Sequence, residues 1–303
     1  MRLQRVVIGT DFSESATAAT SWTANHFAPG AELVVVHSVV IAEIPRFLRG
    51  RTPTIEVLTE TARLGAAQRM REVAERLGGN LVRTEIRIGP AAEQIARACT
   101  EHGADLVVVG RHGERAGILG HLGSTAEELV RIAPVPVLVA AGLRDARPAR
   151  ILVPINESRV ARWVVDWARF LAERFQAQAT ALYIVGAAVF SSVLSGVAVG
   201  SAGGEPSPEA TRAELFQIAD DWLTRLVGGS GQRYSMTVDA MLGDPGEEIV
   251  AAARRMDADL VVMGSRGLGK LGRALLGSVA SYVLRQAPCP TLVVKEPEGE
   301  ATA

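Results

Sequence analysis

Residues 105–110 read Asp-Leu-Val-Val-Val-Gly, and residues 259–264 read Asp-Leu-Val-Val-Met-Gly. The same spacing of 154 residues separates Gly123 from Gly277, so no residue is inserted in either copy between these points. A match without gaps over this length indicates an internal duplication. The 303-residue chain therefore contains two related halves, each of ordinary size for one domain.

The spacing is shorter near the start of each half. Asp11 and Asn156 are 145 residues apart, so the second half carries a net insertion, which we place in the Gly- and Ser-rich stretch 186–208. We expect that stretch to be a loop. The two domains are predicted at residues 1–141 and 149–296.

Each half alternates short apolar runs with longer amphipathic segments. Continuous apolar runs are typical of strands that are buried on both faces of a parallel sheet, and the segments between them are typical of helices. We therefore predict an α/β fold with two doubly wound, open, parallel five-stranded sheets of Rossmann-like topology, whose ligand site lies at the carboxyl ends of the strands. The predicted strands of the first half are residues 5–9, 33–37, 81–88, 106–110 and 135–139.

A loop that begins and ends on glycine follows the fourth predicted strand of each half. Glycine permits positive φ and close approach of a ligand, and a Gly-Ser step that opens a helix offers unpaired N–H groups and a hydroxyl. This combination indicates a phosphate site. The alternative is that the glycines only turn the chain and that the serines cap a helix, but repetition at one spacing favours the phosphate site. The residues are Gly110, Gly113, Gly123, Ser124 and Thr125 in the first half and Gly264, Gly267, Gly277, Ser278 and Val279 in the second.

Two other glycine patterns in the second half are discounted. Residues 264–270 have P-loop spacing, but Leu271 stands where a Ser or Thr would hold Mg²⁺. Residues 267–272 match a dinucleotide fingerprint, yet they follow the fourth strand of their domain rather than the first.

The pattern Gly-x2-Gly-x9-Gly followed by Ser, present in both halves, resembles the nucleotide signature of the universal stress protein family. The chain is similar to a tandem of two such domains. This resemblance implies a nucleotide alpha-hydrolase-like fold and ATP or a related adenine nucleotide as ligand, with or without Mg²⁺. It also implies an Asp close to the nucleoside after the first strand, here Asp11, and a backbone contact to adenine at Val39, with Val185 as its counterpart. Asn156 replaces the acid in the second half, which makes that site the weaker candidate.

The function expected from these features is a cytosolic stress-response regulatory protein that binds an adenine nucleotide in one or both domains. No Ser/His/Asp set recurs in the two halves, so no catalytic residue is predicted. Two alternatives stay open. One is an interaction protein of the same fold that works without nucleotide, and the other is an enzyme with slow ATP hydrolysis or self-phosphorylation.

Composition excludes several other classes. The formal net charge of −1 gives little support for a nucleic-acid surface. Cys99 and Cys289 lie in no metal-binding or disulfide pattern and fit a reducing cytosol. The apolar run at residues 6–8 is too short for a signal peptide. The uncharged stretch 175–204 imitates a membrane span, but it is diluted by Gly, Ser and Ala, and the repeat predicts a strand in its first part.

Several other polar side chains are weaker candidates. His112 and His121 lie in the first glycine loop, where they either touch phosphate or are simply exposed. His37 and Tyr183, at the ends of the second strands, are expected to be structural. The cations Arg111, Arg266 and Lys270 either neutralise phosphates or form a solvated face.

The last strand of each half, at residues 135–139 and 291–294, is expected at a sheet edge. An exposed apolar edge is a liability, and antiparallel pairing of the two strands would cover both. The resemblance supports this pairing, since single-domain members of the family dimerise in a similar way, so the tandem is predicted to form a pseudo-dimer. A further homodimer and protein partners are left open.

Overall fold

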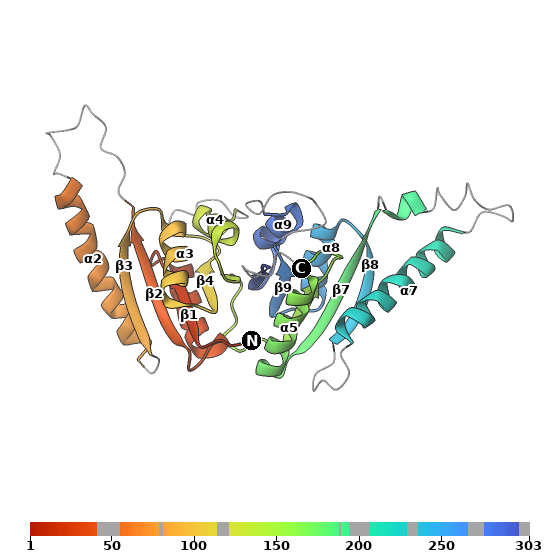
Figure 1. Cartoon of the computed structure of the whole chain (residues 1–303), viewed down its shortest axis with the longest axis horizontal. Coiled ribbons are helices and arrows are strands. Elements are labelled where there is room, and N and C mark those ends of the chain that lie inside the picture. Colours follow the sequence, from red (N-terminus) through yellow and green to blue (C-terminus); the bar gives the residue numbers. More distant parts are fainter. Residues whose placement is uncertain are drawn as a thin grey trace, which may run out of the picture. The chain divides into compact units, whose positions relative to one another are not determined.

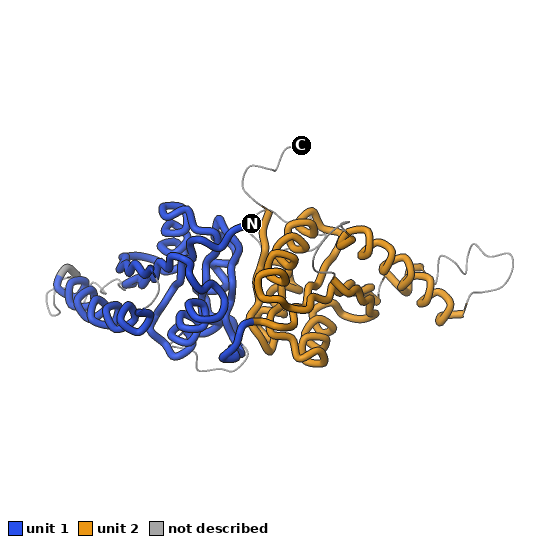
Figure 2. The backbone as a smooth tube through the Cα atoms, turned by 90° about the horizontal axis from the view of Figure 1, so that it is seen from below, with its two compact units in different colours: residues 1–147, 297–303 blue, residues 148–296 orange. Residues whose placement is uncertain are grey.

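The computed structural model describes residues 1–40, 55–78, 81–113, 121–187, 189–193, 207–228, 236–265 and 276–296. The chain divides into two compact units, residues 1–147 and residues 148–296 (Figure 2). Each unit is a parallel sheet with helices packed on it (Figure 1).

Unit 1 contains a five-stranded sheet in the order β3-β2-β1-β4-β5. All four neighbouring pairs are parallel, with Val7 opposite both Val34 and Val107. The chain moves outward from β1 to β3 and then returns to the other side of β1, so the strand order reverses between β1 and β4. Its elements are β1 (Arg5–Gly9), α1 (Glu14–Trp22), β2 (Glu32–Val39), α2 (Ile55–Arg76), β3 (Val82–Ile88), α3 (Ala91–His102), β4 (Leu106–Gly110), α4 (Ser124–Ile132) and β5 (Val137–Ala140).

Unit 2 repeats this topology, with the order β8-β7-β6-β9-β10. Its neighbouring strands are again parallel. The predicted fold, two repeats of a doubly wound α/β domain, is confirmed. The elements are β6 (Arg150–Pro154), α5 (Ala161–Phe175), β7 (Gln178–Gly186), α7 (Pro208–Val227), β8 (Met236–Gly243), α8 (Pro245–Arg255), β9 (Leu260–Gly264), α9 (Ser278–Gln286) and β10 (Thr291–Val294).

The central strands are buried because helices cover both faces of each sheet. Val6, Val7 and Ile8 of β1 are fully buried. On α3, Ile95 and Cys99 are buried as well. Apolar burial of this kind is the main stabilising contribution to the fold.

Two strand predictions need correction. The sequence analysis predicts that the run 81–88 is buried on both faces, but β3 is the outermost strand of unit 1 and is half exposed, which suits its Arg and Glu side chains. The run 135–139 begins as a strand only at Val137, because Pro136 has no N–H to donate; its carbonyl accepts the N–H of Val107 at 3.1 Å.

The aspartate that opens each copy of the repeated motif has a structural role. Asp105 Oδ2 accepts the backbone N–H of Arg5 at 2.9 Å, and Asp259 Oδ2 accepts that of Arg150 at 2.9 Å. Each aspartate thus fastens the start of the first strand of its unit to the start of the fourth.

The uncharged stretch 175–204 begins as the end of α5 and continues into β7. None of the helices in the described ranges is long and apolar enough to cross a membrane. Most of the predicted loop 186–208 lies outside the described residues, and the loop prediction is wrong for residues 187 and 189–193, which are helical.

Candidate functional site

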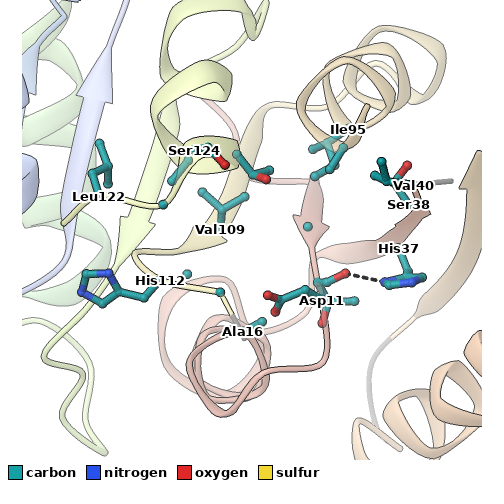
Figure 3. A pocket seen from close by; sticks show the side chains of 18 of the residues that line it. Asp11, Ala16, His37, Ser38, Val40, Ile95, Val109, His112, Leu122 and Ser124 are labelled. Carbon is teal, nitrogen blue, oxygen red and sulfur yellow. Dashed lines mark hydrogen bonds between the residues drawn. The ribbon is translucent and has the colours of Figure 1, made fainter. Parts of the chain in front are cut away.

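The carboxyl ends of β1, β2 and β4 open onto a cavity of about 890 Å³ in unit 1, where the strand order reverses (Figure 3). This is the position at which doubly wound sheets bind ligands. The cavity brings together all seven residues that the sequence predicted for the first site, from three separate loops. They are Asp11, Val39, Gly110, Gly113, Gly123, Ser124 and Thr125.

Asp11 lies in a tight turn between β1 and α1. Its Oδ1 accepts the backbone N–H of Ser13 at 3.0 Å, and the Ser13 hydroxyl in turn caps α1 by accepting the N–H of Ala16 at 3.2 Å. The carboxylate is therefore fixed in direction by the backbone that follows it. Figure 3 shows Asp11 in the wall of the cavity, near His37 and Ala16.

The glycine loop needs its glycines for space. A Cβ on Gly113 would lie 2.4 Å from Asp11 Oδ2, and one on Gly110 would lie 2.7 Å from Ser15 Oγ. The expectation of positive φ at the loop glycines is wrong for those that the structure describes, since none of them is among the residues with positive φ. A side chain at Gly113 would therefore displace the Asp11 carboxylate, whatever the backbone conformation of the loop.

Helix α4 begins beside the cavity. Gly123, in an extended conformation, is its N-cap, and Ser124 is its first residue, so the alternative that Ser124 caps the helix is wrong. The N–H groups of the first turn have no partner within a helix and carry its positive dipole end. Ser124, Thr125 and Ala126 line the cavity with these groups and with two hydroxyls. The arrangement is suited to binding an anion.

The opposite side of the cavity is less polar. Val39 is only 7% exposed, and its carbonyl already accepts the N–H of Gly89 at 3.1 Å. Val40, which the sequence analysis missed, is 65% exposed and lines the cavity. Ala62 of α2 and Ile95 of α3 complete this side. Nothing in the local sequence marks these residues, because they are brought to the cavity by packing of elements that are distant along the chain.

Three histidines line the cavity. The Nδ1–H of His37 donates to the Thr10 carbonyl at 2.8 Å, which ties the end of β2 to the Asp11 turn. His112 is half-buried, and burial, followed by the nearby charge of Arg111, holds its pKa below the usual value. His121 is exposed. Phosphate contact by His112 and His121 stays a prediction, while Arg266 and Lys270 lie outside the described residues.

Unit 2 places the matching residues at the matching points. Asn156 Oδ1 accepts the N–H of Ser158 at 3.2 Å, in the same turn that Asp11 makes. Gly277 caps α9 and donates its N–H to the Ser265 carbonyl at 3.1 Å, as Gly123 does to Arg111 at 2.8 Å. Gly264 ends β9, Ser278 and Val279 open α9, Val185 lies near the end of β7, and Gly267 falls outside the described residues.

Fold and site together define a tandem Rossmann-like α/β protein with a ligand cavity at the strand ends. The model of the universal stress protein family matches residues 2–141 and again residues 149–295. The chain belongs to the universal stress protein family, with one domain in each half.

Relatives of the same length support this assignment. A universal stress protein of Mycolicibacterium smegmatis is 30% identical over 307 residues, which cover 96% of each chain. One from Mycobacterium tuberculosis is 30% identical over 304 residues, covering 96% of this chain and 97% of that protein. The crystal structure of a universal stress protein from Archaeoglobus fulgidus shares the fold, with a TM-score of 0.69, 19% identity, and coverage of 98% of this chain and 97% of that one.

Proposed function

We propose that unit 1 binds an adenine nucleotide, with ATP as the leading candidate, and that the chain is a stress-response regulator whose conformation or partner binding follows occupancy of this site. One observation carries the proposal. A single cavity contains a fixed carboxylate, Asp11, on one wall and the open N-terminus of α4 with its glycine loop on another.

The α4 end of the cavity is suited to phosphate. The Ser124, Thr125 and Ala126 N–H groups and the helix dipole attract negative charge, and the Ser124 hydroxyl adds a donor. Because Gly110 and Gly113 have no side chains, the glycine loop lies close to Ser15 and Asp11 on this side of the cavity.

The other end is suited to a nucleoside. A carboxylate accepts hydrogen bonds from hydroxyl groups such as those of ribose, and Asp11 lies between the phosphate side and the apolar side chains of Val40, Ala62 and Ile95. A base can pack against that apolar surface. The cavity volume of about 890 Å³ lies within the range usual for small-molecule sites, roughly 300–1,000 Å³.

The proposal extends to unit 2 with lower affinity. Asn156 makes the same turn as Asp11, but an amide oxygen lacks the charge that strengthens a hydrogen bond from a ribose hydroxyl. Ser278 at the start of α9 provides the same helix terminus as Ser124.

Thermal unfolding of the full chain with ATP, adenosine and inorganic triphosphate tests the proposal. A ligand that binds only the folded state stabilises it by about 2.7 kcal/mol at a hundredfold excess over Kd. Since 1 kcal/mol shifts the melting temperature by roughly 2–4 °C for 150–250 residues, the melting temperature of the chain should rise by up to about 10 °C with ATP. Unchanged melting at millimolar ATP would favour the nucleotide-independent interaction protein, and release of ADP at a steady rate would favour the slow enzyme.

A further inference from the structure

We propose that Arg69 and Phe12 are positioning residues that hold the turn carrying Asp11, and that they thereby set the affinity of unit 1 for its nucleotide. The inference rests on the proposed function of unit 1. It assigns a role to a contact between α2 and the β1–α1 turn, which lies beside the cavity but is separate from the glycine loop.

Phe12 has an unusual backbone conformation. Its φ is +65°, in the left-handed region that bulky side chains rarely adopt. Within the described ranges, two other non-glycine residues share a positive φ, and both follow the end of a helix: Gln176 after α5 and Asp257 after α8. Left-handed residues are usual at helix ends. Phe12 lies at the start of a helix, so that explanation does not apply to it.

Contacts from two other elements hold this conformation. The guanidinium Cζ of Arg69 lies 4.4 Å from the centroid of the Phe12 ring, and the centroid of the tilted His37 ring is also 4.4 Å from it. Arg69 Nη2 donates to the Phe12 carbonyl at 3.2 Å, and the Phe12 N–H donates to Thr10 Oγ1 at 3.0 Å. We call the three side chains in contact, Arg69, Phe12 and His37, the clamp.

Unit 2 provides an internal comparison. Asn156 makes the same side-chain turn to Ser158, yet Glu157, at the position of Phe12, has no positive φ. The turn by itself therefore does not require the left-handed conformation. Glu157 is also held differently, since its Oε1 accepts a hydrogen bond from the Tyr183 hydroxyl at 3.4 Å. The left-handed conformation of Phe12 is therefore found together with the clamp contacts, and the turn alone, as in unit 2, does not produce it.

The clamp acts next to the functional carboxylate. Asp11 precedes Phe12 directly, so a change in the Phe12 backbone redirects the Asp11 side chain and its hydrogen bond to Ser13. Arg69 and Ala62 are seven residues apart on α2 and share one helix face, and Ala62 lines the cavity. Helix α2 therefore contributes to the cavity wall and also holds the turn that presents Asp11. If the contact between α2 and the turn raises the affinity for the ligand by some factor, ligand binding stabilises that contact by the same factor, because linkage is reciprocal.

The first test is the variant Arg69→Met, which removes the charge and the donor and keeps an apolar stem. Arg63→Met is the matched control, since Arg63 is an exposed arginine on the same helix that pairs with Glu60. ATP titrations of the full chain, followed by NMR at the Ser124 and Thr125 amides, report unit 1 alone. We expect Arg69→Met to weaken binding about five- to tenfold, Arg63→Met to bind like wild type, and Phe12→Tyr, which keeps the ring, to bind within about twofold of wild type.

A double-mutant cycle separates positioning from a general effect on folding. Asp11→Asn keeps the turn, as Asn156 does in unit 2, and removes only the charge. If Arg69 acts through the Asp11 carboxylate, adding Arg69→Met to Asp11→Asn should weaken binding less than about twofold. An equal loss with and without the carboxylate, or equal affinity of Arg69→Met and Arg63→Met, would overturn the inference.

Hydrogen exchange in the ligand-free protein gives a readout that does not depend on nucleotide. The amides of Phe12 and Ser13 should exchange faster in Arg69→Met than in Arg63→Met, while β1 amides stay protected. Faster exchange in a protein that binds no nucleotide would contradict the proposed function and support the clamp. Unchanged exchange would overturn the clamp and leave the proposed function standing.

Discussion

The substitution Gly113→Ala tests the contact between the glycine loop and the Asp11 turn. An added Cβ would lie 2.4 Å from Asp11 Oδ2, whereas ordinary C···O contacts are about 3.3–3.6 Å. The carboxylate or the loop must therefore move by about 1 Å. Because Asp11 Oδ1 is bonded to the Ser13 N–H, rotation of the side chain also breaks that hydrogen bond. Loss of one charge-assisted hydrogen bond to the ligand costs about 1.5–3 kcal/mol, which is roughly a ten- to hundredfold increase in Kd.

Isothermal titration of the full chain with ATP measures this change, and Gly65→Ala is the matched control. Gly65 lies in α2, and a Cβ there would meet no atom within 4 Å. The control should bind like wild type and gain up to about 1 kcal/mol of stability from the higher helix propensity of alanine. Equal affinity of Gly113→Ala and Gly65→Ala would refute the account of the loop.

Three further predictions concern the two sites, pH and the tandem arrangement. Asp11→Asn should lower the ATP affinity of unit 1 toward that of unit 2, and Asn156→Asp should raise the ATP affinity of unit 2 about tenfold or more in the same titration. Equal affinities of the two sites in wild type would contradict the prediction that unit 1 binds more tightly. The pKa of His112 is lowered in the folded state, so the unfolded chain binds more protons just below pH 6.5, and the free energy of unfolding should fall as pH drops through that range. Urea unfolding should show a smaller fall for His112→Gln than for wild type, and identical pH profiles of the two proteins would refute this role of His112. The pairing of the last strands stays a prediction from the sequence, for which Val139→Pro should give two separate thermal transitions or faster proteolysis near Arg147, while a single unchanged transition would count against it.

The fold was predictable because its signals are local and occur twice. The buried runs at β1 and β4 have the predicted bounds, since short apolar segments next to Gly and Asp leave little choice of register. The edge position of β3 depends on the strand order, which local sequence patterns do not reveal, although its Arg and Glu side chains fit an edge.

The candidate site was predictable only in part. The glycine loop has a spacing that repeats in both halves, and Asp11 is recognisable from its place directly after the first strand, where the second half has Asn156. Val40 and Ala62 have no such pattern, because they reach the cavity through the packing of β2 and α2. The sequence also suggests the wrong reason for a glycine at position 113, namely a positive φ. The close contact with Asp11 cannot be seen in the sequence, because it joins two loops about a hundred residues apart.

Native mass spectrometry of the full chain, purified without added nucleotide and then titrated with ATP, tests the central claim most directly. The account predicts that one adenine nucleotide is retained or bound first, and that Gly113→Ala loses this tight complex while Gly65→Ala keeps it. A protein that stays free of nucleotide at millimolar ATP, or one that binds GTP, CTP and ATP equally, would contradict the claim that the cavity of unit 1 is an adenine-nucleotide site.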